Sequence, residues 1–304
     1  MSKLVTDIKS LEIETLKNLK NSKSSNTLRA YKSDYKDFAG FCISHGFKSM
    51  PTDPKILSLY LTHLSQTSKF STLKRRLASI SIIHKLSGHY IDTKHPMITE
   101  NLMWIKRKNG SYQKAKKPIL INDLKSIINV IDKDQNEKRR LKNRTLILVG
   151  FAGGFRRSEL VAILIEDIDF VTEGVKIFIK RSKTDQSGEG MTKGIPYFSN
   201  SKYCPVVSLK NWLAKLEIKG GKVFDMSDKN VALTIKKYTA IAGLDSNKYS
   251  GHSLRSGFAT SAAELGAEER SIMAMTGHKT TQMVRRYIHE ANLFKNNALN
   301  KIKI

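Results

Sequence analysis

Apolar residues recur at spacings of three and four along most of this 304-residue chain, and no other feature limits the fold as strongly. One such stripe consists of Leu28, Tyr31, Tyr35, Phe38 and Cys42. This spacing places side chains on one face of an α-helix, where they can pack on a common core. The pattern predicts a mainly helical protein.

Two further helices are expected within the first hundred residues. One should begin at Asp53-Pro54, because aspartate can cap a helix and proline fits its first position. The other lies within the segment 70–88, where three consecutive basic side chains point away from the apolar face. These are candidate nucleic-acid contacts: Lys74, Arg75 and Arg76.

The period of the apolar residues changes to two at a single place. Every second residue from Val175 to Ile179 is apolar, as expected of a β-strand. We expect a loop over 182–194 and a return strand over 195–198, with 163–170 as a candidate third strand. The sequence therefore predicts a small antiparallel sheet inside a helical domain.

Residues 106–118, KRKNGSYQKAKKP, have the composition of a linker. They would separate a helical domain over 1–105 from a second domain over 119–304. A basic linker can cross an anionic partner or simply carry a solvated run of charge, and the segment alone does not separate the two. Its candidate contacts with such a partner are Lys106, Arg107 and Lys108.

The chain carries 53 Lys and Arg against 27 Asp and Glu, a formal net charge of +26. Residues 1–118 have 22 basic and 8 acidic residues, and residues 119–304 have 31 and 19. A surplus of this size is typical of proteins that bind a polyanion, most often nucleic acid. A lysine-rich genome explains part of the lysine content but explains the shortage of acidic residues less easily. We expect both domains to face the same anionic partner.

Cys42 and Cys204 are the only cysteines. Their number and separation exclude a disulfide framework and a cysteine-based zinc module, and they fit a reducing cytosol. No apolar run reaches transmembrane length, and the polar N-terminus does not resemble a signal peptide. We expect a soluble, cytoplasmic protein without a membrane partner.

A short C-terminal segment holds most of the side chains that could carry chemistry. His252 and Arg255 could both reach one phosphate from a helix, although an exposed helix face explains the pair more simply when it stands alone. Gly277 fits a left-handed helix end, and His278 directly follows it. Tyr287, nine residues later, could be a covalent nucleophile or an aromatic residue on an apolar face.

Two other groups lie upstream. In GGFRRSEL, Arg156 follows two glycines that let the backbone approach a ligand, and Glu159 could orient it. A surface ion pair is the simpler explanation, and for Arg157 we keep the surface interpretation. In the expected hairpin loop, Lys183 could protonate a leaving oxygen, although most lysines here are simply solvated. No HExxH motif or carboxylate cluster occurs, so we expect no metal site and no cofactor.

The order and spacing of these residues resemble the tyrosine recombinases, the phage integrase family. GGFRRSEL is similar to the family's first-arginine motif, RSKT to its β-hairpin lysine motif, and SGHSLR with TGHKTTQMVRRYI to its second motif. These matches cover residues 150–290, and the first 110 residues resemble the family in organisation only. The resemblance implies a SAM-like helical core-binding domain and a catalytic tyrosine recombinase domain, together mainly α with a small antiparallel β-sheet.

The resemblance also implies site-specific recombination through a 3′-phosphotyrosyl intermediate, for integration or excision of a mobile element or for resolution of DNA multimers. It assigns the catalytic positions to Arg156, Lys183, His252, Arg255, His278 and Tyr287, with Glu159 in support. Neither ATP nor a metal ion would be required. A type IB topoisomerase that relaxes DNA, and a non-cutting DNA-binding protein derived from an integrase, are the alternatives.

The implied partners are double-stranded DNA, gripped by both domains, and further copies of the chain. Family members act as homotetramers on two synapsed sites, and the free protein could be a monomer. Leu293, Phe294 and Leu299 in the C-terminal tail would be available to dock on a neighbouring subunit. Such a protein would be cytoplasmic and associated with the nucleoid.

Overall fold

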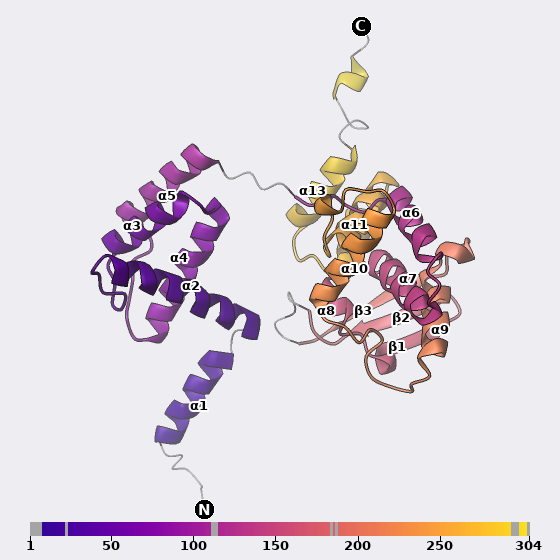
Figure 1. Ribbon diagram of the computed structural model, residues 1–304, viewed down its shortest axis with the longest axis horizontal. Coiled ribbons are helices and arrows are strands. Elements are labelled where there is room, and N and C mark those ends of the chain that lie inside the picture. Colours follow the sequence, from indigo (N-terminus) through magenta and orange to yellow (C-terminus); the bar gives the residue numbers. More distant parts are fainter. Residues whose placement is uncertain are drawn as a thin grey trace, which may run out of the picture. The chain divides into compact units, whose positions relative to one another are not determined.

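The computed structural model describes residues 8–21, 24–110, 115–182, 185, 188–292 and 298–302. The chain forms two compact units, Met1–Lys114 and Ala115–Ile304, here called the N-terminal and C-terminal units (Figure 1). The division falls within the segment that the sequence marks as a linker. Each unit has its own hydrophobic core.

The N-terminal unit is built from helices throughout its described residues. They are α1 (Ile8–Asn21), α2 (Ser25–Ser44), α3 (Pro54–Ser65), α4 (Phe70–Leu86) and α5 (Pro96–Asn109). The predicted start of α3 is confirmed, because the Asp53 side chain accepts a hydrogen bond from the Ile56 N–H at 2.8 Å. The predicted stripe on α2 faces the core, where Phe38 packs edge-on against Tyr60 of α3 with ring centroids 5.1 Å apart.

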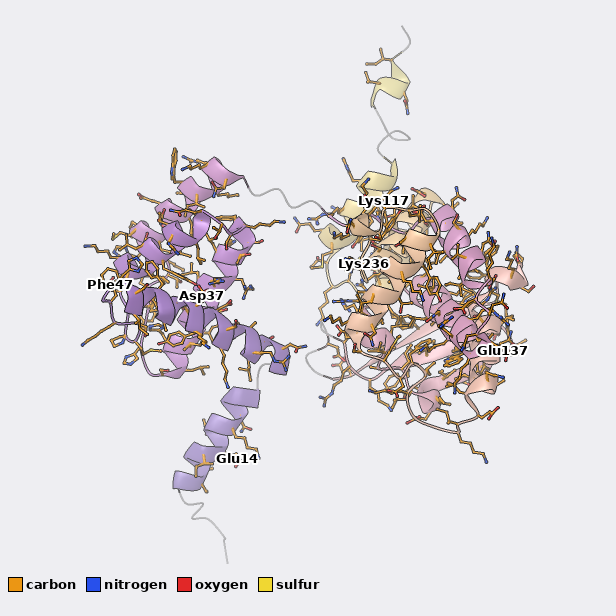
Figure 2. All side chains as sticks on the ribbon, viewed as in Figure 1. Glu14, Asp37, Phe47, Lys117, Glu137 and Lys236 are labelled. Carbon is orange, nitrogen blue, oxygen red and sulfur yellow. The ribbon has the colours of Figure 1, made fainter. Side chains whose placement is uncertain are left out.

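Helix α5 corrects the expected boundary between the domains. It continues to Asn109, so Lys106, Arg107 and Lys108 belong to its last turn and not to the predicted linker. Basic side chains favour this end of a helix because they face its partial negative charge. Further along, the N–H of Lys117, labelled in Figure 2, already donates to a carbonyl of the C-terminal unit at 2.7 Å.

The C-terminal unit combines helices with one small sheet. Its α-helices are α6 (Ile121–Ile131), α7 (Glu137–Ala152), α8 (Arg157–Leu160), α9 (Pro205–Leu216), α10 (Asp228–Ile241), α11 (Ser253–Glu264), α12 (Glu269–Thr276) and α13 (Thr281–Asn292). Its 3-10 helices are η1 (Ile165–Asp167), η2 (Ser201–Tyr203), η3 (Ser246–Lys248) and η4 (Ala298–Lys301). Residues 145–152 of α7 are all buried, and the helix packs against α6, α9 and α11. No described helix has the length and apolar character needed to cross a lipid bilayer.

The sheet is antiparallel throughout, in the order β1–β2–β3 (Figure 1). Its strands are β1 (Ile168–Val171), β2 (Gly174–Ile179) and β3 (Met191–Pro196). The strand predicted at 175–179 is confirmed. The return strand starts at Met191, four residues earlier than predicted, because Ile179 pairs with Met191 and Gly174 with Pro196. Only the end of the candidate third strand is extended, since η1 occupies the residues before it.

Candidate active site

A turn of two glycines leads from α7 to Arg156. Gly153 ends the helix, and Gly154 has a φ of +54°, a left-handed conformation that other residues rarely adopt. Arg156 then caps α8: its N–H donates to Glu159 Oε2 at 2.9 Å, and its guanidinium donates to Glu159 Oε1 at 2.6 Å. The surface ion pair considered from the sequence is wrong, because Glu159 is only 2% exposed.

Glu159 stays charged in spite of its burial. Burial alone would raise the pKa of the carboxyl, but hydrogen bonds from the Arg156 backbone and guanidinium and from the Ser182 hydroxyl outweigh it and lower the pKa. The Ser182 hydroxyl donates to Glu159 at 2.8 Å and accepts from the Arg156 guanidinium at 2.7 Å. The same guanidinium reaches the Gly277 carbonyl at 3.4 Å. The direction of the Arg156 side chain is therefore fixed by hydrogen bonds to several partners.

Arg255 lies in the first turn of α11 and is 1% exposed. Its Nη1 donates to the Gly154 carbonyl at 2.8 Å, while the buried Nη2 has no hydrogen-bond partner within the described parts of the chain. Burial, and then repulsion from Arg156, lowers its pKa to about 10, so the group is still a cation at neutral pH. A buried guanidinium with an unused donor is suited to bind a phosphate oxygen.

Tyr287 on α13 meets His252 at the start of α11. The Tyr287 Oη lies 3.2 Å from His252 Nε2. Desolvation, and then the guanidinium groups of Arg255 and Arg156, lower the pKa of His252, so its imidazole is neutral at pH 7. A neutral imidazole nitrogen can accept the phenolic proton.

His278 also lies beside Tyr287, with ring centroids 6.0 Å apart. Gly277 ends α12 with a φ of +64°, which confirms the predicted left-handed helix end. His278 Nδ1 lies 2.7 Å from Thr276 Oγ1, which fixes the ring. Burial and nearby cations, Arg255 first among them, lower the pKa of His278 to about 4, so this imidazole is also neutral at pH 7.

The structure thus brings five of the six predicted catalytic residues together from four parts of the C-terminal unit. They are Arg156, His252, Arg255, His278 and Tyr287. The sixth, Lys183, lies outside the described residues. Three hydrogen bonds link these parts. One runs from Arg255 to the turn before α8, one from Arg156 to the end of α12, and one joins His252 at the start of α11 to Tyr287 on α13.

Lys193 belongs to this site and was missed from the sequence. It lies on β3 with 1% of its surface exposed, and its Nζ donates to the Gly153 carbonyl at 2.7 Å. Glu159 Oε2 is 4.0 Å from the same nitrogen. Burial lowers the pKa of Lys193 to about 7, although Glu159 opposes this shift. Met191, Lys193 and Ile195 recur at every second residue, which is the available signal, but the predicted loop over 182–194 includes Lys193 and obscures it.

Arg76 is engaged inside the N-terminal unit, which argues against the predicted DNA contact. It pairs with Asp37 of α2, labelled in Figure 2, and donates to the Tyr60 hydroxyl at 2.6 Å, with 18% of its side chain exposed. Arg75 pairs with the buried Asp34 on the same helix, although half of its side chain is exposed. Both guanidinium groups therefore hold α4 against α2.

The other basic candidates lie on the surface. Lys74 is exposed on α4, and Lys106, Arg107 and Lys108 are exposed on the last turn of α5. Arg157 is a surface residue as predicted, with 42% of its side chain exposed and its guanidinium 3.8 Å from Asp228.

Comparison with known proteins points to one family. The model of the "Phage integrase family" matches residues 119–293. An "Integrase/recombinase xerD homolog" from Selenomonas ruminantium is 40% identical over 307 residues, covering 96% of this chain and 89% of the relative. "Tyrosine recombinase XerC" of Staphylococcus haemolyticus (strain JCSC1435) is 24% identical over 270 residues, covering 88% of this chain and 87% of the relative.

Solved structures show the same fold. The XerH site-specific recombinase in a post-cleavage complex with difH substrate aligns with a TM-score of 0.61 and 21% identity, covering 83% of this chain and 72% of XerH. A lambda integrase (75–356) dimer bound to a COC′ core site aligns with a TM-score of 0.59 and 19% identity, covering 97% of this chain and 99% of the integrase. Since the family model spans more than half of the sequence and a relative shares 40% identity over nearly all of it, this chain belongs to the phage integrase family, the tyrosine recombinases.

Proposed function

We propose that this protein is a site-specific recombinase that cuts and rejoins DNA through Tyr287. The observation that carries the proposal is the 3.2 Å contact between Tyr287 and His252 beside Arg255, a buried cation whose Nη2 has no partner among the described residues. Relatives named as recombinases support the reaction, and XerH and lambda integrase, both solved with DNA, support the substrate.

In the cleavage step the Tyr287 oxygen attacks the phosphorus of one phosphodiester. His252 takes the phenolic proton, a 3′-phosphotyrosyl bond forms, and the bond to the 5′ oxygen breaks. The leaving oxygen becomes a 5′-hydroxyl by taking a proton, for which Lys183 is the proposed donor. Attack by the 5′-hydroxyl of another strand then restores a phosphodiester and releases the tyrosine.

Arg156 and Arg255 hold the non-bridging oxygens of the phosphate. Negative charge builds on these oxygens in the transition state, and preorganised cations stabilise it more strongly than they stabilise the starting diester. Glu159 keeps Arg156 in place through two hydrogen bonds. His278, whose ring lies beside that of Tyr287, contributes a further hydrogen bond to the phosphate.

The decisive experiment uses a nicked DNA substrate from which the cut strand diffuses away, so that the covalent intermediate accumulates. A protein–DNA adduct should form in EDTA and be absent with Tyr287→Phe. An adduct that persists in this variant, or that requires Mg²⁺, contradicts the proposal. Relaxation of supercoiled plasmid without joining of two sites would favour the topoisomerase instead. The pairs of sites that recombine then distinguish integration or excision from resolution of multimers.

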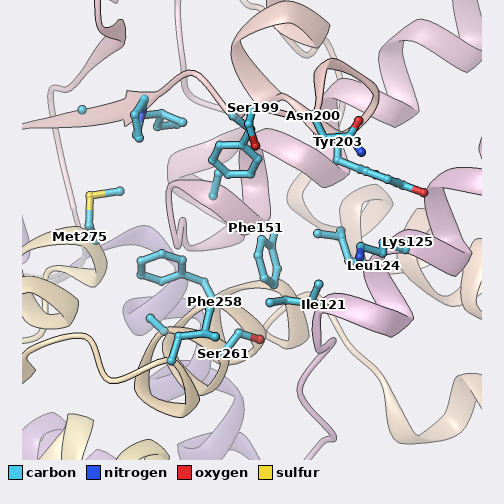
Figure 3. Close-up of a pocket in the computed structure, with 17 residues that line it drawn as sticks. Ile121, Leu124, Lys125, Phe151, Ser199, Asn200, Tyr203, Phe258, Ser261 and Met275 are labelled. Carbon is cyan, nitrogen blue, oxygen red and sulfur yellow. The ribbon is translucent and has the colours of Figure 1, made fainter.

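We propose that copies of the chain contact one another on DNA through an apolar pocket in the C-terminal unit. The cavity of about 660 Å³ is lined by residues of α6, α7, α11, α12 and β3 and of the segment after β3, and the rings of Phe151 and Phe258 pack edge-on in its wall (Figure 3). The proposed occupant is the C-terminal segment of a second copy. Leu299 in η4 and Ile302, which directly follows η4, are both more than half exposed. Leu293 and Phe294 lie outside the described residues.

This assembly is tested by changing Leu299 and Ile302 together to aspartate. The variant should lose recombination between two sites and tetramer formation on DNA, but should keep adduct formation on a single site. Ile241→Asp on α10, where the side chain is also exposed, is the matched control. Wild-type recombination by the double variant contradicts the proposed docking.

A further inference from the structure

A buried lysine that the proposed cleavage step does not use lies beneath the two arginines. Lys193 is 1% exposed, and a lysine is rarely this buried because its ammonium loses water that its partners must replace. Its Nζ contacts the Gly153 carbonyl at 2.7 Å, lies 4.4 Å from the ring centroid of Phe155, and is 4.0 Å from Glu159. All three partners belong to the segment that carries Arg156.

Lys193 and Arg255 hold consecutive carbonyls of the same turn. Lys193 donates to the carbonyl of Gly153, and Arg255 donates to that of Gly154 at 2.8 Å. The turn includes the left-handed Gly154 and leads within two residues to Arg156. The position of one arginine is therefore tied to the other through a piece of backbone whose carbonyls accept hydrogen bonds from both Lys193 and Arg255.

Lys193 also faces the carboxylate that directs Arg156. Glu159 binds the Arg156 backbone and guanidinium, and the Lys193 ammonium is on the Oε2 side of that carboxylate. We propose that Lys193 is a positioning residue that acts through Gly153 and Glu159 to set the separation of the Arg156 and Arg255 guanidiniums for one phosphate. The inference rests on the proposed function, because it takes these two arginines to bind the scissile phosphate.

A role in stability alone makes a different prediction from a role in positioning. Replacing a buried charge by an apolar side chain of similar length often leaves stability unchanged or raises it. Glu159 keeps its hydrogen bonds from Arg156 and Ser182 when Lys193 is removed. Lys193→Met should therefore fold and should melt no lower than the wild type at pH 7, yet it should cleave DNA more slowly.

The test is single-turnover formation of the covalent adduct on the nicked substrate, with DNA in excess. Lys193→Met should react about 100-fold more slowly, because small displacements of groups around the reacting atoms have effects of this size. Its affinity for DNA should stay within about twofold, since most phosphate contacts lie elsewhere. Lys193→Arg keeps the cation and should recover at least about tenfold of the loss. Lys176→Met is the control, because Lys176 is exposed on β2 and pairs with the neighbouring Gly194.

The outcomes separate this inference from the proposed function. If the wild type forms no adduct, or Tyr287→Phe still forms one, the proposed function fails first. If the wild type forms the Tyr287 adduct and folded Lys193→Met matches its rate, only the role of Lys193 is overturned. If the Met variant does not fold, Lys193→Gln takes its place, since its amide keeps a donor without the charge. If neither folds, or if Lys193→Arg is as slow as the uncharged variant, the inference is likewise overturned.

Discussion

In the proposed reaction Tyr287 must lose its proton to attack phosphorus, and at the scale of single residues His252 is placed to take it. The ordinary tyrosine pKa near 10 leaves the phenol protonated at pH 7. His252 is 3.2 Å away and neutral there, since desolvation and the two arginines lower its pKa. The cations proposed to hold the phosphate therefore also keep this histidine able to accept a proton.

Cleavage should slow in acid for this reason. The pKa of His252 is lowered, so its accepting form predominates above the ordinary value of about 6.5 and is lost as the pH falls through the lowered pKa. Single-turnover rates between about pH 4.5 and 8 would show this acid limb. His252→Gln should be slower at pH 8 and should lack the limb. If the variant showed the same fall in rate at low pH, the protonation of a group other than His252 would be its cause.

The pH dependence of the protein's stability should report the lowered pKa of Lys193, independently of any activity measurement. Its pKa is about 7 in the folded protein and near 10.5 in the unfolded chain, so between these values the unfolded chain binds more protons. The contribution of this group to stability therefore rises with pH across that window, by at most about 1.4 kcal/mol per pH unit. Below pH 7 Lys193 is protonated in both states, and the full cost of burying its charge lowers the stability. Denaturant unfolding of the wild type and Lys193→Met should be measured at pH 7, 8 and 9. The free energy of unfolding of the wild type should rise relative to that of the variant as the pH rises. A constant difference would contradict the lowered pKa.

At the scale of elements, local signals were enough for the helices and failed for one strand. The cap at Asp53 and the stripe on α2 act within a few residues, so the sequence contains the whole signal. The start of β3 depends instead on pairing with β2, and Lys193 breaks its apolar alternation. A lysine turned into the core looks like a loop residue until its distant partners are known.

For the candidate site too, the sequence predicts one part and leaves another part open. Spacing and residue type are enough to predict, as candidates, five residues that the structure brings together, because the family motifs are short and ordered: Arg156, His252, Arg255, His278 and Tyr287. Spacing does not reveal that Arg255 binds the carbonyl of Gly154, which lies 101 residues earlier. Contacts of this kind depend on how α7 and α11 pack, and no local pattern encodes them.

The turn before α8 should tolerate no side chain at Gly154. Its φ is +54°, and an added Cβ would lie 3.1 Å from the Phe258 ring. Gly154→Ala should lower the free energy of unfolding by about 1–3 kcal/mol, as measured by denaturant titration, and should slow cleavage because Arg156 follows the turn. Gly40→Ala is the control. Gly40 is exposed within α2 with no atom near the added Cβ, so a gain of about 0.5–1 kcal/mol is expected. Equal effects at the two positions would contradict the strain argument.

At the scale of the whole molecule, the net charge of +26 is carried by both units, and binding to DNA should fall steeply with salt. Changing Lys106, Arg107 and Lys108 to glutamine should reduce the slope of log affinity against log salt by up to about 3, if each contacts one phosphate. Lys215→Gln is the control, because this lysine pairs with Glu137 at 2.7 Å. Titrations at several salt concentrations measure the slope. An unchanged slope would place the contacts elsewhere.

The 3.2 Å contact between Tyr287 and His252 joins two segments of the same chain, which has a consequence for how the subunits of the proposed assembly would divide the reaction. Arg156 reaches the Gly277 carbonyl of its own chain as well, so we expect each copy to hold the proposed nucleophile, base and anion-binding groups by itself. Two different defective subunits should then be unable to complement one another. An equimolar mixture of Tyr287→Phe and Arg255→Ala proteins should give no covalent adduct on a single-site substrate. An adduct in the mixture would mean that one subunit lends its tyrosine to another.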